Sequence, residues 1–82
     1  MTTKVKLYTT PSCPFCVAAL RLLDQREVPY ENVDVSDYGL RSQVQEEHGW
    51  PTVPVVIGNG ELIGGFSELE ALDASQGLDH LK

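Results

Sequence analysis

The chain has few basic residues, and this shortage excludes several kinds of partner. Six lysine and arginine residues stand against twelve aspartate and glutamate residues, which gives a formal net charge of −6. Nucleic acids and anionic membranes are bound through clustered lysine and arginine side chains. We therefore expect neither a nucleic acid nor a membrane as partner.

The chain also lacks long apolar runs. A segment that crosses a bilayer needs about 20 mostly apolar residues, and the sequence contains none. Residues 1–8 alternate polar and apolar types and include Lys4 and Lys6, so they do not form the continuous apolar stretch of a secretory signal. We therefore expect a cytoplasmic protein.

The length of 82 residues and the 41% hydrophobic content are those of one small globular domain. We expect a single domain over residues 1–82, present as a monomer. Only two cysteines are present, which is too few for a disulfide-stabilised scaffold.

Local patterns predict the order strand, helix, strand, helix, strand, strand, helix. The predicted strands cover residues 5–8, 30–35, 55–58 and 61–64, and the predicted helices cover 17–26, 39–48 and 67 to the helix stop at Gly77. Leu40 and Val44 are the expected inward pair of the middle helix. Ser67 and Glu70 are spaced as a capping box for the last one, and residues 78–82 form a tail that adds a last turn.

These elements predict the topology of the sheet. A strand–helix–strand unit implies a parallel pair with a right-handed crossover. Asn59-Gly60 between two apolar runs is a strong signal for an antiparallel hairpin. The fold class is therefore α/β, with a four-stranded mixed sheet and helices on both of its faces.

The spacing Cys13-Pro14-Phe15-Cys16 carries the chemistry. Proline favours the first helical position, which places Cys13 at the N-cap, where its sulfur faces free backbone N–H groups and the positive end of the helix dipole. A thiolate is stabilised there, so Cys13 is the expected nucleophile. Cys16 lies one turn further along, on the apolar face, and suits a resolving thiol.

Three less reactive roles compete with redox chemistry for these cysteines. A structural disulfide would close almost no loop, and a zinc site needs further ligands, whereas His48 and His80 lie far apart in the sequence. Two core cysteines could also share this spacing by coincidence. Their position directly after a strand and at the start of a helix favours redox chemistry.

Two further segments fit a substrate groove. In Thr52-Val53-Pro54, a cis proline would turn the backbone of Val53 toward a substrate cysteine, whereas the plain alternative is an ordinary turn proline before an edge strand. Gly65 permits close backbone approach, the helix start at Ser67 suits a carboxylate, and Glu68 suits an ammonium. The plain alternative there is a strand-to-helix turn.

Taken together, the segments Cys13-Pro14-Phe15-Cys16, Thr52-Val53-Pro54 and Gly64-Gly65-Phe66-Ser67-Glu68-Leu69 resemble the three signatures of the glutaredoxin family, in order and at its spacing. Glu70-Ala71-Leu72-Asp73 and Gly77-Leu78-Asp79 most resemble the short dithiol glutaredoxins of bacteria.

The resemblance implies a thioredoxin-like fold and a glutathione-disulfide oxidoreductase. Such an enzyme reduces protein disulfides and glutathione mixed disulfides, with glutathione as co-substrate, no tightly bound cofactor and no metal. By similarity, Cys13 attacks the substrate sulfur and Cys16 resolves the mixed disulfide. The implied partners are glutathione and disulfide-containing or glutathionylated proteins. The implied glutathione-binding residues are Phe15, Thr52, Val53, cis Pro54, Gly65, Ser67 and Glu68.

Two departures from the family pattern leave alternatives open. Thr10 stands where many members carry a lysine for the glycine carboxylate of glutathione, and Trp50 lies in a stretch that often supplies arginine or glutamine. One alternative is a glutaredoxin-like electron donor that thioredoxin reductase reduces, for example for ribonucleotide reductase. Another is a non-catalytic thioredoxin-fold adaptor or iron–sulfur carrier.

Overall fold

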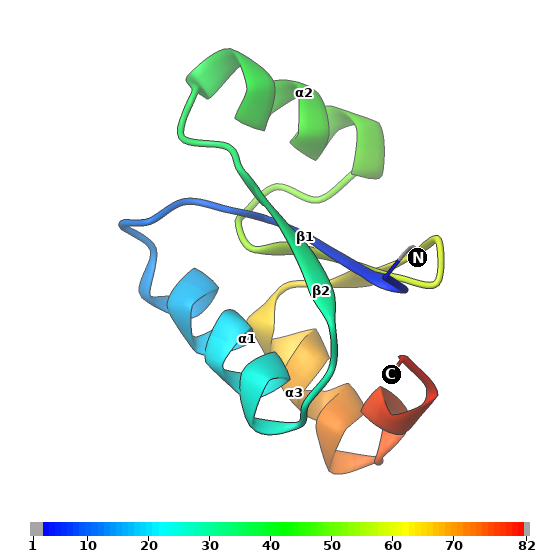
Figure 1. The fold of residues 1–82 in the computed structure, drawn as a ribbon. Helices are drawn as coiled ribbons and strands as arrows, with labels where there is room; N and C mark the ends of the chain where they lie inside the picture. Colours follow the sequence, from blue (N-terminus) through cyan, green and yellow to red (C-terminus); the bar gives the residue numbers. More distant parts are fainter. Residues whose placement is uncertain (1–2, 82) are drawn as a thin grey trace.

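The computed structural model describes residues 3–81, which form a four-stranded sheet flanked by helices (Figure 1). In chain order the elements are β1 (Val5–Thr9), α1 (Pro14–Gln25), β2 (Tyr30–Asp34), α2 (Tyr38–His48), β3 (Val55–Gly58), β4 (Glu61–Gly64), α3 (Phe66–Ala74) and the 3₁₀ helix η1 (Gly77–Leu81). Within this part of the chain, no helix is both long and apolar enough to cross a membrane.

The sheet has the strand order β2-β1-β3-β4. β1 pairs with β2 in parallel and with β3 in antiparallel orientation, and β3 pairs with β4 in antiparallel orientation. The predicted mixed sheet and its element order are therefore confirmed. The parallel pair requires the crossover through α1, and this crossover brings the start of α1 to the C-terminal end of β1.

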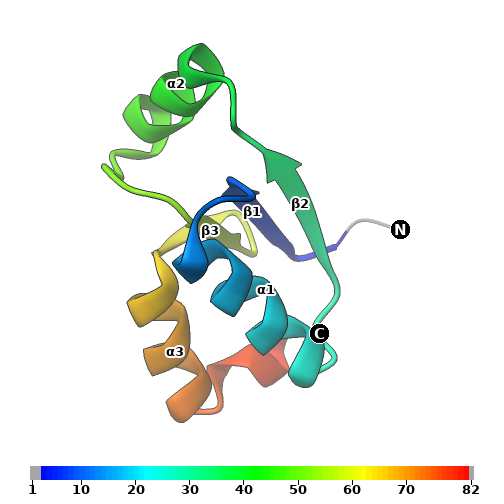
Figure 2. The same cartoon turned by 90° about the vertical axis from the view of Figure 1, so that its left-hand side faces the viewer.

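Helices cover both faces of the sheet, as predicted. Figures 1 and 2 show α1 and α3 side by side against one face and α2 against the other. The face under α1 and α3 holds the larger core, because its strands alternate in burial and α1 presents an apolar stripe to it. This core contains Val5, Leu7, Ala19, Leu23, Val28, Val56, Leu69, Leu78 and Leu81.

The face under α2 has a smaller core. It consists of Val35, Val44 and Val55, with partly buried residues packed around them. Val44 is buried as predicted, but Leu40 remains 38% exposed, so the expected inward pair is half wrong. The reason is that α2 contributes a single buried residue, so its apolar face is narrower than the spacing suggested.

The hairpin between β3 and β4 turns at the predicted residues. Asn59 and Gly60 have φ values of 56° and 82°, as a two-residue turn with both central residues in the left-handed region requires. A β-bulge between Val56 and Ile57 shifts the register of this pair. The turn carries the chain back toward Gly64, beside the start of α3.

The start of α3 differs from the prediction. The N-cap is Gly65 and the helix begins at Phe66, so the expected capping box of Ser67 and Glu70 is wrong. Instead, the Glu68 carboxylate accepts a hydrogen bond from the backbone N–H of Gly65 at 3.0 Å. A glycine has no side chain that could reveal the cap in the sequence, whereas the serine two residues later matched the usual pattern.

The end of the chain is more compact than expected. α3 ends at Ala74, three residues before the predicted stop at Gly77, and the tail forms the 3₁₀ turn η1 (Gly77–Leu81). Leu78 and Leu81 are buried in the larger core. The predicted tail extended to Lys82, which lies outside the described residues.

Candidate active site

Cys13 occupies the N-cap of α1, as the sequence predicted. Its backbone is extended, with φ −94° and ψ 116°, and Pro14 follows at the first helical position. Residues 14–17, which form the first turn, include no acidic side chain. The partial positive charge at this helix end is therefore not offset by an acid within the turn.

The sulfur of Cys13 lies against the segment that contains Pro54. The thiol donates to the backbone carbonyl of Val53, with Sγ 3.7 Å from the oxygen, and the Val53–Pro54 peptide bond is cis as expected. Among the described residues, the Cys13 side chain makes no capping hydrogen bond to α1. This differs from the expectation that the sulfur faces the free backbone N–H groups at the start of the helix, because the sulfur lies against the Val53 carbonyl instead.

Cys16 is held in a contrasting environment, since the residue is only 1% exposed. The pKa of the Cys16 thiol is raised to about 11, chiefly by burial and also by its hydrogen bond to Cys13 and by the Cys13 charge, while hydrogen bonds with Thr10 act in the opposite direction. A thiol with this pKa is ionised to only about 0.01% at pH 7, against about 1% for an unperturbed thiol with a pKa of 9.0. Both cysteines are free thiols.

Thr10 has a place that the sequence could not show. It is only 6% exposed, its carbonyl accepts a hydrogen bond from the Cys13 N–H at 3.3 Å, and it hydrogen-bonds Cys16. Thr10 and Cys16 also line a cavity of about 200 Å³ between the ends of β1 and β2 and the start of α1. The residue that stands in place of a lysine therefore contacts both cysteines.

A groove of about 280 Å³ opens beside Cys13. Its lining residues are Phe15, Trp50, Thr52, Val53, Pro54, Gly65, Phe66, Ser67 and Glu68. All seven residues that the resemblance implied for glutathione binding lie along this groove. They come from α1, the loop before β3 and the start of α3, so the fold brings together segments that are far apart in the sequence.

Aromatic side chains form the walls of the groove. Phe15 is 61% exposed, and its ring centroid lies 6.2 Å from that of Phe66. Trp50 packs so closely on the opposite segment that a Cβ added to Gly64 would lie 3.1 Å from its ring. Phe66 was not predicted as a site residue, although it directly follows Gly64-Gly65. For Trp50 the sequence left open a core or rim position and a groove wall, and it lines the groove.

The start of α3 forms the other end of the groove. Gly64, with φ +128°, and Gly65 allow the chain to pass beneath Trp50. The first four backbone N–H groups of a helix, counted from the N-cap, have no backbone partner within the helix. In α3 the N–H of Gly65 is bonded to the Glu68 carboxylate, which leaves those of Phe66, Ser67 and Glu68. The groove therefore ends at an anion-favouring helix terminus that also carries one carboxylate.

The two histidines take no part in this arrangement. The ring of His48 lies 5.6 Å from that of Tyr8, and His80 is exposed within η1. Over residues 3–81, no group of three or more His, Cys, Asp and Glu side chains is placed to hold a metal ion.

Comparison with known proteins identifies the family. A family model described as Glutaredoxin matches residues 5–63. The chain belongs to the glutaredoxin family. Members of this family are generally thiol–disulfide oxidoreductases, and the fold of the chain is thioredoxin-like. The resemblance inferred from the three segments is thus confirmed.

Relatives match this glutaredoxin over most of its length. Glutaredoxin 3 of Escherichia coli K12 is 35% identical over 78 residues, which cover 94% of this chain and 94% of that protein. The crystal structure of glutaredoxin 1 from Francisella tularensis, complexed with cacodylate, has a TM-score of 0.84 at 32% identity and covers 95% of this chain and 99% of its own. The solution structure of a dithiolic glutaredoxin from Trypanosoma brucei brucei has a TM-score of 0.82 at 36% identity, with coverage of 96% and 86%.

Proposed function

We propose that this glutaredoxin is a glutathione-dependent thiol–disulfide oxidoreductase that acts through Cys13 and Cys16. The observation that carries the proposal is the placement of the two sulfurs. Cys13 lies at the N-cap of α1 and contacts Val53 at the groove, whereas Cys16 is 1% exposed behind it. One thiol can meet a substrate, and the other can act only after the first has reacted.

The groove supplies groups that match the parts of glutathione. The backbone of Val53 is within reach of Cys13 and can pair with the cysteinyl unit of a ligand joined to that sulfur. The backbone N–H groups of Ser67 and Glu68 can receive the γ-glutamyl carboxylate. One oxygen of Glu68 already accepts from Gly65, so the second oxygen is the one that can bind the ammonium.

The first chemical step exchanges one disulfide for another. The Cys13 thiolate attacks the glutathionyl sulfur of a mixed disulfide, the Cys13–glutathione bond forms, and the substrate sulfur leaves as a thiolate that takes a proton from solvent. A second glutathione thiolate then attacks the glutathionyl sulfur. Cys13 leaves as a thiolate, and glutathione disulfide is the oxidised product.

A protein disulfide is reduced through Cys16. After Cys13 has formed a mixed disulfide with the protein, Cys13 no longer carries a charge and no longer accepts the Cys16 hydrogen bond, and both of these raised the pKa of Cys16. The hydrogen bonds with Thr10 still lower that pKa. Cys16 therefore loses its proton more readily at the stage when its thiolate must attack Cys13 and release the protein thiol.

Two reductase systems separate this proposal from its nearest alternative. The purified protein is supplied with NADPH and a disulfide substrate, together with either glutathione and glutathione reductase or thioredoxin reductase alone. Turnover with the glutathione system is the expected result. Turnover only with thioredoxin reductase would instead support a glutaredoxin-like electron donor that thioredoxin reductase reduces.

A further inference from the structure

Among the described residues that line the groove, one side chain is ionisable, and it is acidic. Of the nine lining residues, only Glu68 ionises, while the walls are aromatic and the remaining residues are neutral. The whole chain adds a net charge of −6 around this site. A ligand carboxylate that lies along the groove away from the start of α3 therefore meets no charge that attracts it.

The basic side chains of the described residues are engaged elsewhere or lie outside the groove lining. Arg26 forms an ion pair with Asp73, with Nε 2.9 Å from Oδ1, and thereby joins the end of α1 to α3. Arg41 lies over the ring of Tyr38 at 5.6 Å. Arg21 is exposed on α1 and does not line the groove.

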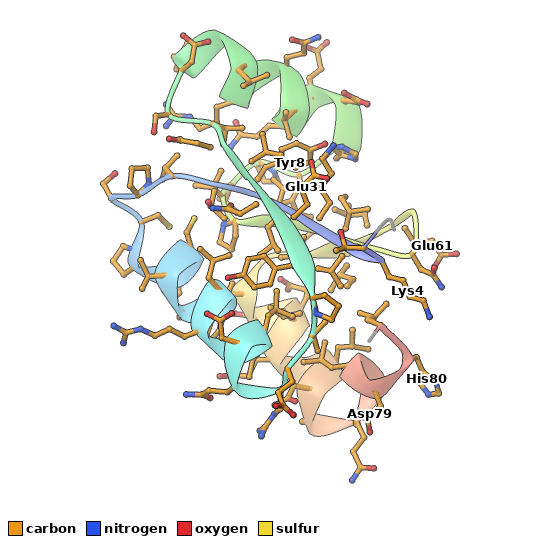
Figure 3. All side chains as sticks on the ribbon, in the orientation of Figure 1. Lys4, Tyr8, Glu31, Glu61, Asp79 and His80 are labelled. Carbon is orange, nitrogen blue, oxygen red and sulfur yellow. The ribbon has the colours of Figure 1, made fainter. Side chains whose placement is uncertain are left out.

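The two lysines of β1 and its approach lie at a distance from Cys13 along the sheet. Lys6 Nζ lies 3.8 Å from a carboxylate oxygen of Glu31. Lys4 donates to the backbone carbonyl of His80 at 3.5 Å, and Figure 3 shows Lys4 and His80 together at the end of the molecule opposite the loop that leads into α1. Over residues 3–81, no cation is thus positioned at the groove.

Glutathione carries two carboxylates and one ammonium. If the proposed function holds, the γ-glutamyl carboxylate and the ammonium are met by the start of α3 and by Glu68. The glycine carboxylate gains no ion pair, and the negative field of the protein disfavours it. We infer that this groove does not recognise the glycine carboxylate. Cys13 should therefore take a glutathionyl group whose glycine is esterified or amidated from a mixed disulfide at least as fast as it takes the glutathionyl group itself.

An internal competition tests this inference directly. The Cys16→Ser variant, which cannot resolve the adduct, is mixed with equal excess amounts of two disulfides of 2-mercaptoethanol, one with glutathione and one with its glycine ethyl ester. Cys13 attacks the glutathionyl sulfur, 2-mercaptoethanol leaves as a thiolate and takes a proton, and mass spectrometry measures the ratio of the two Cys13 adducts.

At 10 mM ionic strength, where charges act over about 30 Å, the expected ratio of the ester adduct to the free-acid adduct lies between about one and three. At high salt this ratio approaches one. A preference for the free acid at low salt would overturn the inference. Absence of both adducts would instead overturn the proposed function, on which the inference rests.

A matched pair of variants tests the cause. Thr52 is exposed and lines the groove, so Thr52→Lys adds a cation there and Thr52→Gln adds similar bulk without charge. Relative to Thr52→Gln, the lysine variant is expected to shift the adduct ratio toward the free acid by about two- to fivefold, the usual size of an exposed ion pair. Equal ratios in the two variants would contradict the electrostatic cause and overturn the inference.

Discussion

The helices α1 and α3 both begin at the groove, but their first turns differ in charge. The first turn of α1, residues 14–17, contains no acidic side chain, and its N-cap is the thiol Cys13. The first turn of α3 contains Glu68, whose carboxylate accepts from the N–H of Gly65 at the N-cap. The two helix ends therefore present different electrostatic environments to the same groove.

This difference explains how one groove can bind a ligand at one end and place a reactive thiol at the other. At α3, the positive end of the helix dipole is partly offset by Glu68, which suits a zwitterionic ligand end that carries both a carboxylate and an ammonium. At α1, no acidic side chain of the first turn offsets the helix dipole beside Cys13, which suits a thiolate that forms and leaves. Four predictions test this contrast and the contrast between the two thiols.

The largest effect is expected when the sulfur at the start of α1 is removed. Cys13→Ser should lower turnover of both glutathione mixed disulfides and protein disulfides by more than about 1,000-fold, because a serine oxygen cannot form the intermediate disulfide. The glutathione reductase-coupled assay measures this loss. Circular dichroism provides the folding control, and residual turnover above about 1% would contradict the role of Cys13.

Removal of the second sulfur should separate the two reactions. Cys16→Ser should retain removal of glutathione from mixed disulfides within about threefold, because a second glutathione completes that reaction. Reduction of protein disulfides should fall by about 100-fold or more, since no internal thiol remains to release the protein. Comparison of the two substrates in one assay checks this difference. An equal loss of both reactions would show that Cys13 and Cys16 do not have the separate roles proposed here.

The raised pKa of Cys16 predicts how stability depends on pH. In the folded protein its pKa is about 11, above the value of 9.0 for an unperturbed thiol, so between these pH values the unfolded chain loses a proton that the folded protein keeps. The Cys16 contribution to the free energy of unfolding is present in full below pH 9 and is lost as pH rises toward 11, by about 2 kcal/mol.

Urea unfolding of the reduced protein at pH 8 and pH 10.5, each against Cys16→Ser, isolates this contribution from the titration of lysine and tyrosine. The difference in the free energy of unfolding between the two proteins should be smaller at the higher pH. A difference that stays constant would show that Cys16 titrates alike in the folded and unfolded states.

The smallest effect comes from adding an acid to the start of α1. Phe15→Glu, compared with Phe15→Gln, should slow alkylation of Cys13 by iodoacetamide at pH 7 by about three- to tenfold, because a nearby negative charge disfavours the thiolate. Glu68→Gln should change that rate by less than about twofold and should cost about 1 kcal/mol of stability through the weakened bond to Gly65.

Rate measurements on the three variants, together with urea unfolding of Glu68→Gln, check this prediction. Equal alkylation rates for Phe15→Glu and Phe15→Gln would mean that the charge of the first turn does not affect the reactivity of the Cys13 thiol.

The sequence predicted the features that depend on local chemistry. Pro14 placed Cys13 at the start of a helix because proline suits the first helical position. Asn59-Gly60 placed the hairpin because both residues tolerate positive φ. The separation of an accessible from a buried thiol followed from the helical spacing of Cys13 and Cys16.

The features that depend on tertiary contacts could not be predicted in the same way. Trp50 contacts Gly64 only because the loop before β3 folds across the start of α3, and its indole Nε1 is buried without a hydrogen-bond partner among the described residues. Thr10 contacts Cys16 because the loop after β1 turns inward. Neither contact leaves a periodic signal along the chain.

The most direct test of the division between the two thiols is to ask which one reacts first. The reduced protein is treated at pH 7 with one tenth of an equivalent of iodoacetamide, and peptide mapping by mass spectrometry locates the label. Because Cys13 is partly exposed beside the groove and Cys16 is buried with a pKa of about 11, we predict at least about 100-fold more label on Cys13. Equal labelling of the two residues, or preferential labelling of Cys16, would contradict this division.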